Sequence, residues 1–228
     1  WNANISPKKF AKTLSGFDMV IHLASYIPQN HQDEGEAKKC IDINSIGTLN
    51  LLNSCKLANV KRFVFISSAN IFAADSKKKK ITKSSMIDCR HSPYYLGSKI
   101  LAEIFVKSLS LKKISTLIIR PSSIYGDNMK NGAIKDISRK LLSKQKIVLK
   151  NNGKYQADFL YIDDFVSVIE KLAFSKVNGE INVGSGTATS IYNLTKTIAK
   201  IHSIKSKKIT LLPYQNKYFK GFYPVDLN

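Results

Sequence analysis

The 228-residue sequence contains few of the residues that build disulfide frameworks or metal sites. It has three cysteines, and none of them forms a Cys-x-x-Cys pair. The four histidines are scattered along the chain without the spacing of metal ligands. Cys40, Cys55 and Cys89 therefore indicate free thiols in a reducing cytoplasm, and the sequence predicts no metal site.

Long apolar runs are also missing. No segment reaches the ~18 consecutive apolar residues that a membrane-spanning helix needs. Apolar residues still make up 43% of the chain, which is typical of a globular protein. A chain of this length has material for one hydrophobic core with a small additional lobe. We therefore expect a cytoplasmic protein without a membrane span.

Acidic residues are scarce, since 16 Asp and Glu face 36 Lys and Arg, which gives a net charge of +20. Such a balance attracts phosphates, nucleic acid or an anionic membrane surface. Most of the lysines are spread along the chain, however, and residues 77–80 form the one run of four. A solvated loop is the simpler interpretation of this run. Because no basic-aromatic platform or known nucleic-acid motif accompanies the charge, nucleic acid is not the expected partner.

What the sequence does contain is a tyrosine and a lysine four residues apart, Tyr95 and Lys99, near the start of a predicted helix. One helical turn separates them, so both side chains project from the same face. An ammonium within a few ångströms stabilises a phenolate and lowers the tyrosine pKa from about 10 toward the range useful for proton transfer. In isolation the pair is a weak signal, because both residues are common on helix surfaces.

Two hydroxyls upstream strengthen the signal. Ser67 and Ser68 follow an apolar segment that is typical of a buried strand. Ligands in open parallel sheets lie outside the carboxyl ends of the strands. A serine there can hydrogen-bond the substrate oxygen whose proton the tyrosine exchanges. Turn residues are the alternative interpretation, but the Tyr-x-x-x-Lys pair downstream favours the functional one.

These motifs, with others in the same order, resemble the NAD-dependent epimerase/dehydratase family of extended short-chain dehydrogenases/reductases, which includes many sugar-nucleotide enzymes. The segment with Asn44 resembles the Asn-x-x-Gly-Thr helix of that family, for example, and the segment after Arg120 resembles the end of its sixth strand. The matching segments are 18–25, 44–52, 61–68, 92–99, 120–126, 158–164 and 179–186. They extend over nearly the whole chain, which coincidence does not explain.

The resemblance implies an α/β fold, a Rossmann-like doubly wound parallel sheet with a small carboxyl-terminal substrate lobe. It places the NAD(P)-binding domain at 1–126 plus 158–184 and the substrate lobe at 127–157 plus 185–228. The alternation of apolar patterns agrees with this fold. We expect strands at 18–24, 62–67, 115–121, 147–149, 181–183 and 209–212. We expect helices at 7–15, 36–58, 93–112, 131–144, 163–175 and 191–201, the last with Ser190 as its N-cap.

One element of the family has no counterpart. No Gly-x-x-Gly-x-x-Gly turn, which holds the cofactor pyrophosphate at a helix N-terminus, occurs anywhere in the sequence. The first recognisable element resembles the fourth strand of the family. We therefore expect a chain that lacks the first three strands of its domain, exposes the edge of its strand at 18–24 and is inactive on its own.

The resemblance also implies a site and a cofactor, NAD or NADP. Tyr95 would remove the proton of a substrate hydroxyl, Ser68 would hold that oxygen, with Ser67 as the fallback, and Lys99 would hold the nicotinamide ribose and keep Tyr95 acidic. The implied cofactor-binding positions are Leu23, Ala24, Ser25, Asn44, Ser67, Tyr95, Lys99, Pro121 and Ser122. The implied substrate-binding positions are Ser68 and Ser123. For Leu23 and Ala24, packing at the end of a strand is the alternative interpretation.

Departures from the family restrict the reaction. Dehydratases of this family carry an acidic pair where this chain has Ala69 and Asn70, neither of which can transfer the protons that eliminating water requires. An epimerase and a reductase remain open, since both use the same Ser, Tyr and Lys.

The substrate is less well defined. Ser123 and Ala157 replace an asparagine and an arginine that grip the nucleotide diphosphate in many sugar-nucleotide members, which removes a charge-assisted contact. A nucleotide-activated sugar is the first expectation, and a non-nucleotide substrate is the second. A protein of another class, one that binds RNA or an anionic surface on the same fold, is a further alternative. A homodimer is a candidate assembly.

Overall fold

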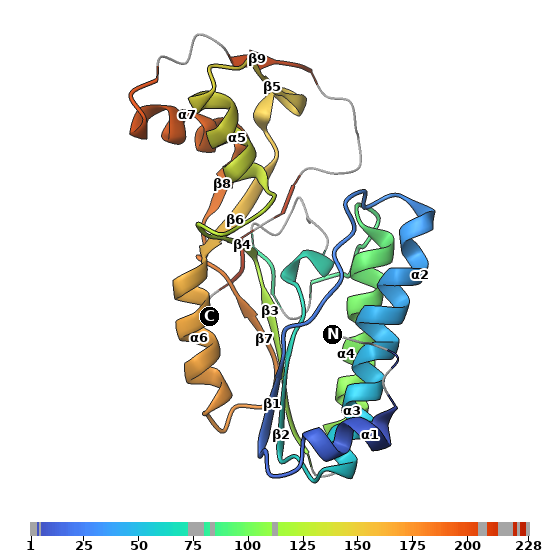
Figure 1. Ribbon diagram of the computed structural model, residues 1–228. Helices are drawn as coiled ribbons and strands as arrows, with labels where there is room; N and C mark the ends of the chain where they lie inside the picture. The colour runs from blue at the N-terminus through green and yellow to red at the C-terminus, as the bar shows by residue number, and fades with distance from the viewer. Residues whose placement is uncertain are drawn as a thin grey trace. The chain divides into compact units, whose positions relative to one another are not determined.

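A computed structural model shows how the chain folds (Figure 1). It describes residues 4, 6–72, 80–82, 85–110, 114–204, 209–213, 221–222 and 224–226. Three of the four lysines of the run at 77–80 lie outside these ranges. The chain divides into two compact units, which are described separately. Unit 1 consists of Trp1–Ala73, Met86–Pro121 and Ser167–Val183, and unit 2 of Ala74–Ser85, Ser122–Val166 and Gly184–Asn228.

Unit 1 is built on a parallel sheet in the order β1-β2-β3-β7. Its strands are β1 (Met19–His22), β2 (Arg62–Ile66), β3 (Ser115–Pro121) and β7 (Gly179–Val183). The central strands β2 and β3 carry almost continuous apolar sequence; Phe63, Val64 and Phe65 of β2 are fully buried. Such runs are typical of parallel strands that are covered on both faces. Among the described residues, β1 pairs only with β2 and forms one edge of the sheet.

Helices cover both faces of this sheet, as Figure 1 shows. α1 (Pro7–Thr13), α3 (Gly47–Leu57) and α4 (Pro93–Ser110) lie on one face, and α6 (Ile162–Ala173), which belongs to unit 1 from Ser167 on, lies on the other. A sheet covered in this way confirms the predicted doubly wound α/β fold. None of the helices in the described ranges has the length and apolar character that a membrane crossing requires.

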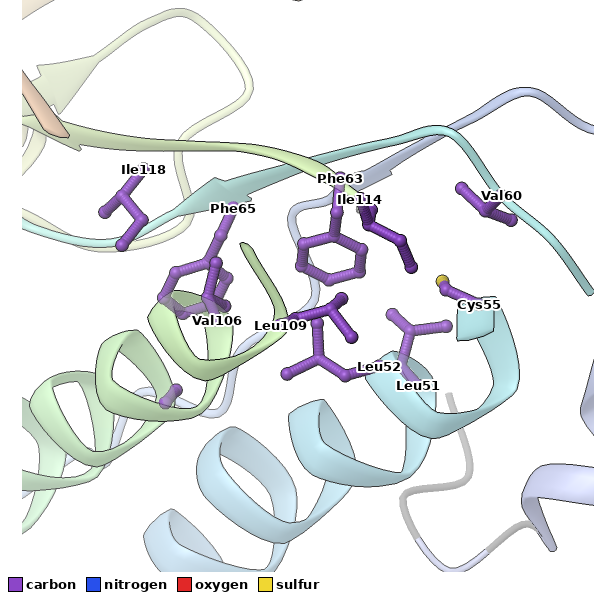
Figure 2. Packing of buried hydrophobic residues seen from close by; sticks show 11 residues of the cluster. Leu51, Leu52, Cys55, Val60, Phe63, Phe65, Val106, Leu109, Ile114 and Ile118 are labelled. Carbon is purple, nitrogen blue, oxygen red and sulfur yellow. The ribbon is translucent and has the colours of Figure 1, made fainter. Parts of the chain in front are cut away.

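The main core of unit 1 lies between β2, α3 and α4 (Figure 2). α4 contributes Val106 and Leu109 to this cluster, and in Figure 2 the Phe65 ring of β2 lies next to Val106 and the Phe63 ring next to Leu109. Full burial of side chains of this size contributes about 1.5–3 kcal/mol each. The buried residues of this cluster are Leu51, Leu52, Cys55, Val60, Phe63, Phe65, Ala102, Val106, Leu109, Ile114 and Ile118. This packing fixes α4 against β2, and it therefore sets where the first turns of α4 lie relative to the end of that strand.

Unit 2 contains two small sheets and its own core. β4 (Ser123–Tyr125), β6 (Gln156–Tyr161) and β8 (Ala188–Ser190) form one sheet, and β5 (Ile147–Leu149) pairs in parallel with β9 (Ile209–Leu211). The helices α5 (Ala133–Leu142) and α7 (Ile191–Ile201) pack together through a cluster that includes Ile137, Leu141, Leu194 and Ile198. The Ser190 hydroxyl accepts a hydrogen bond from the Asn193 N–H at 3.1 Å, which confirms the predicted N-cap of α7.

The predicted elements are all present, with ends that differ by a few residues, but three strands were not predicted. These are β4, β6 and β8. β6 lacks the alternation of a half-buried strand, because it buries the polar Asp158 beside apolar neighbours. The predicted helix at 36–58 is also not continuous. It consists of a 3₁₀ turn (Glu34–Glu36), α2 (Ala37–Cys40), a π-helical segment (Ile41–Ile46) and α3.

Candidate functional site

The carboxyl end of β2 carries the two predicted hydroxyls. Ser67 is 4% exposed, and its hydroxyl oxygen is buried without a hydrogen-bond partner among the described residues. Ser68 is also buried, and its hydroxyl accepts the Asn70 N–H at 3.2 Å, which caps the short 3₁₀ helix Ala69–Ile71. The Ser68 hydroxyl keeps its own hydrogen for donation. A buried polar atom without a partner is rare in proteins and needs an explanation, such as a role in catalysis or contact with a water or an ion.

Lys99 reaches the same strand end from α4. The helix begins at Pro93, whose fixed φ suits the first helical position, so Lys99 lies in its second turn. Its side chain is 2% exposed, and the ammonium donates to the Ile66 carbonyl at 2.6 Å. The ammonium also lies 4.3 Å from the centre of the Phe65 ring. The structure thus places a buried cation directly before the Ser67–Ser68 pair.

Tyr95 lies one turn before Lys99 and is half-buried. The Ser25 side chain lies near its phenol, and the His31 ring contacts the Tyr95 ring edge-on with 6.3 Å between ring centres. His31 is held in turn by a hydrogen bond of 2.7 Å between its Nδ1 and the Ser92 hydroxyl. The segment after β1 therefore covers the tyrosine.

The predicted lowering of the Tyr95 pKa is wrong for this structure. Burial raises the pKa of Tyr95, and the Ser25 side chain opposes this only in part. The Lys99 ammonium donates to a backbone carbonyl instead of the phenol. Burial lowers the pKa of Lys99 itself to about 7, although the Glu103 carboxylate opposes that shift. Desolvation is the cause in both residues, since it disfavours the charged form of each.

Asn44 holds the turn that follows β1. Its side-chain oxygen accepts from the Tyr26 N–H at 2.6 Å and from the Ser25 hydroxyl at 3.2 Å. Its amide group donates to the Tyr26 carbonyl at 2.9 Å and to the Ser98 hydroxyl of α4 at 3.0 Å. Asn44 is 1% exposed and lies in the π-helical segment, a rare conformation that is frequent at functional sites. The amide therefore positions the turn against α4.

The remaining predicted positions fall in different surroundings. Leu23 directly follows β1 with 58% of its surface exposed, and Ala24 is half-buried. Pro121 is buried at the end of β3 in unit 1. Ser122 and Ser123 belong to unit 2, where the Ser122 hydroxyl donates to the Asp158 carboxylate at 3.3 Å.

Unit 1 therefore brings together most of the predicted site. The parallel strands β1 and β2 end at the same edge of the sheet, and α4 presents Tyr95 and Lys99 there. The sequence analysis did not predict two charged residues of this region as site residues. These are Glu103 and Arg120, the second of which it named only as part of a motif. The spacing of four residues from Tyr95 to Lys99 to Glu103 was the signal for the first. The described residues contain no cluster of three or more His, Cys, Asp or Glu that would hold a metal ion.

Proteins of similar sequence have names that fit this site. A protein described as "dTDP-D-glucose 4,6-dehydratase" from Dictyostelium discoideum is 29% identical over 197 residues, which cover 81% of this chain and 45% of that protein. A "Putative UDP-glucose 4-epimerase" from Methanocaldococcus jannaschii is 26% identical over 231 residues, which cover 98% of this chain and 74% of that protein. The chain thus spans less than half the length of the first of these relatives.

Solved structures share the fold. A UDP-glucuronic acid 4-epimerase from Bacillus cereus, in complex with UDP-glucuronic acid and NAD, matches with a TM-score of 0.84 at 21% identity, over 100% of this chain and 71% of that one. The UDP-glucose 4-epimerase of Thermotoga maritima with UDP-glucose matches with a TM-score of 0.82 at 22% identity, over 96% and 72%. These likenesses confirm the predicted Rossmann-like fold.

A family model gives the assignment itself. The model described as "NAD dependent epimerase/dehydratase family" matches residues 4–184, which is most of the chain. The match confirms both the resemblance seen in the sequence motifs and the nicotinamide cofactor class that it implied. The chain belongs to the NAD dependent epimerase/dehydratase family.

Proposed function

We propose that the protein interconverts a carbinol and a carbonyl of a nucleotide-activated sugar, as an epimerase or a reductase that uses NAD. The observation that carries the proposal is the Lys99 ammonium at the carboxyl end of β2, on the helix that also presents Tyr95. Family membership supports the cofactor, and the names of the relatives support the substrate class.

The residues at the strand end fit a nicotinamide ribose. The unpartnered Ser67 hydroxyl and the Lys99 ammonium, which has hydrogens beyond the one given to Ile66, are suited to ribose hydroxyls. Ser67 and Lys99 would hold the cofactor there. When bound, NAD accepts a hydride from the substrate carbinol and returns it to the carbonyl. The hydride chemistry belongs to the cofactor, and the protein supplies binding, orientation and proton transfer.

Tyr95 would move the proton. As a phenolate, Tyr95 would accept the proton of the substrate hydroxyl on oxidation, and as a phenol it would return that proton to the carbonyl oxygen on reduction. Ser68 would donate its free hydrogen to the same substrate oxygen and hold it in place. A protonated Lys99 close to the ribose stabilises the phenolate that forms on Tyr95. Each of these steps is reversed when the carbonyl is reduced, so the same residues serve both oxidation and reduction.

Dehydration is outside the proposal despite the likeness to a dehydratase. Ala69 is buried and has no functional group, and Asn70 has an amide in place of a carboxyl group. Elimination of water needs a proton donor and a base at these positions, and neither residue can be one at neutral pH.

The test uses the full-length protein with NAD and a panel of UDP- and dTDP-hexoses. We expect either C4 epimers or a keto sugar as the product. Tyr95→Phe is expected to lower kcat at least 100-fold, whereas the neighbouring Tyr94→Phe serves as the matched control and keeps activity. The proposal fails if no NAD binds and no sugar reacts across the panel. Binding to RNA or anionic vesicles that weakens steeply with salt and ignores NAD would favour the basic binding protein instead.

A further inference from the structure

The face of α4 that carries Tyr95 and Lys99 has a third charged or polar member. Glu103 follows Lys99 by four residues, so the three side chains lie one turn apart along the helix. Glu103 is 3% exposed, which is rare for a glutamate unless it is paired. Lys99 and Glu103 are thus opposite charges that are both buried on one helix face.

A cation from β3 fixes the carboxylate of Glu103. The Arg120 Nε donates to Oε1 at 2.8 Å, and a terminal nitrogen of the same guanidinium donates to Oε2 at 2.5 Å. Arg120 is 5% exposed, and its guanidinium lies 5.2 Å from the centre of the Phe72 ring. The Glu180 carboxylate is 3.7 Å from the same guanidinium. Two parallel hydrogen bonds hold a carboxylate in one orientation, which a single contact does not.

Among the described residues, Glu103 is the anion that acts on the charge of Lys99. His22 of β1 faces it but is neutral, because burial first and the Lys99 charge second lower the pKa of His22 to about 3. Tyr95 on α4 is neutral at pH 7, since burial raises its pKa. Glu103 favours the charged form of Lys99 against the cost of burial. The other contacts of the ammonium, the Ile66 carbonyl and the Phe65 ring, carry no net charge.

We propose that Glu103, held by Arg120, is a positioning residue that keeps the Lys99 ammonium charged beside the Ser67–Ser68 pair. The role rests on the proposed function, because it gives Lys99 the charge that the ribose contact and the Tyr95 phenolate need. The pair is also a structural link between α4 and β3. A structural link alone would affect folding but would leave the titration of Lys99 unchanged.

The test measures the titration of Lys99 in Glu103→Gln, which keeps the shape and removes the charge. The readouts are the NMR pH titration of the Lys99 side-chain carbon in lysine-labelled protein, assigned with Lys99→Arg, and the pH dependence of kcat/KM. We expect the titration to move at least one unit to lower pH, with about a tenfold loss of kcat/KM above pH 7 that is regained at lower pH. The matched control is Glu180→Gln, which removes a carboxylate near the same arginine and is expected to leave both curves in place.

A second variant covers the case in which Glu103→Gln does not fold. The double variant Glu103→Gln with Arg120→Met removes both members of the ion pair, so that Arg120 is not left as an unpaired buried charge, and we expect the Lys99 titration to move in the same direction. A folded variant in which Lys99 titrates as in the wild type overturns the proposal. The NMR titration needs no turnover. If the wild type is inactive on every sugar but the Lys99 titration still moves in the Glu103 variants, only the proposed function is refuted.

Discussion

Among the residues that the structure describes, each unit buries one carboxylate, and the two carboxylates are satisfied in different ways. In unit 1, Glu103 is paired with the Arg120 guanidinium. In unit 2, Asp158 is 1% exposed and accepts hydrogen bonds from uncharged donors alone, as far as the described residues show. A buried carboxylate that is matched by a cation depends on that one charged partner for its stability. One that is solvated by neutral N–H and O–H groups acts mainly on the chain that supplies them.

The donors to Asp158 come from segments that are far apart in the sequence. They are the Ser185 N–H and hydroxyl, both at 2.7 Å, the Gly186 N–H at 3.1 Å, the Val225 N–H at 3.0 Å and the Ser122 hydroxyl at 3.3 Å. A Cβ added at Gly184 would overlap with the carboxylate, so the chain can approach only as glycine. Asp158 thus joins three separate segments of unit 2, whereas Glu103 joins one helix to one strand.

The largest expected effect on stability comes from removing the Asp158 carboxylate in unit 2. Asp158→Ala leaves the backbone N–H groups of Ser185, Gly186 and Val225 without their acceptor, at about 1–3 kcal/mol for each group that is buried, as Val225 is, so we expect the free energy of unfolding to fall by about 5 kcal/mol. Urea denaturation gives the value, and hydrogen exchange at residues 184–186 locates it. Asp164→Ala, at an exposed position in the first turn of α6, is the control and should cost less than about 1 kcal/mol. Equal losses in the two variants would contradict the role of Asp158.

The carboxylate of unit 1 should respond differently to a second substitution. Glu103→Gln leaves Arg120 as an uncompensated buried charge, and we expect a loss of about 3–5 kcal/mol in the free energy of unfolding. Adding Arg120→Met should recover most of that loss, because an apolar side chain replaces the unpaired cation. No second substitution of this kind can rescue Asp158→Ala, because three of its partners are backbone N–H groups, which no substitution removes. If the double variant is no more stable than Glu103→Gln, the stability loss comes from changed packing and not from the unpaired charge of Arg120.

Lys99 adds a pH dependence that is confined to unit 1. Its pKa in the folded state is about 7, below the ordinary value of 10.5, so the unfolded chain binds more protons between these values. The free energy of unfolding should therefore rise with pH through this window, by at most ~1.4 kcal/mol per pH unit from this group. Lys99→Met removes this contribution to the pH dependence of stability. Urea denaturation gives the difference in the free energy of unfolding between the wild type and Lys99→Met, and this difference should change by about 2 kcal/mol from pH 7.5 to pH 9. If the free energies of the two proteins change with pH in parallel, Lys99 is not desolvated as described.

The smallest effects come from single hydroxyls at Asp158. Ser122→Ala removes the longest of its hydrogen bonds, and we expect a loss of about 0.5 kcal/mol in the free energy of unfolding. Ser185→Ala removes a hydroxyl at 2.7 Å from the same oxygen and should cost about 1–1.5 kcal/mol. The order of the two losses in urea denaturation is the test. The reverse order would mean that the hydroxyl distances do not reflect the strength of the contacts.

Sequence reasoning found the elements whose pattern is local. The apolar run of β2 and the N-cap of α7 are visible in a few adjacent residues, and both are confirmed. β6 was missed because its strand character comes from pairing with β4 and β8, and its buried Asp158 looks like a loop residue. The π-helical segment was missed for a similar reason. Its conformation depends on the contacts of Asn44 with the turn after β1 and with Ser98, which no local pattern contains.

The site was predictable in part. Motif order led to Ser67, Ser68, Tyr95 and Lys99, and the structure gathers them at one edge of the sheet. The sign of the Tyr95 pKa shift was not predictable, because it depends on burial and on the direction of the Lys99 ammonium. The partner of Glu103 was not predictable either, since Arg120 lies on another strand.

The π-helical segment Ile41–Ile46 has a consequence for how this chain tolerates change in length. A π turn holds one residue more than an α turn, so it acts as a single-residue insertion absorbed within a helix. Deleting one residue there would restore regular α winding and rotate everything before it by about 100° relative to α3. The core face of α3 would stay in phase, but Asn44 would lose its alignment with the turn after β1. The extra residue of the π-helical segment thus sets the rotation of α2 and Asn44 relative to α3. It lets α3 pack into the core while Asn44 points toward the turn after β1.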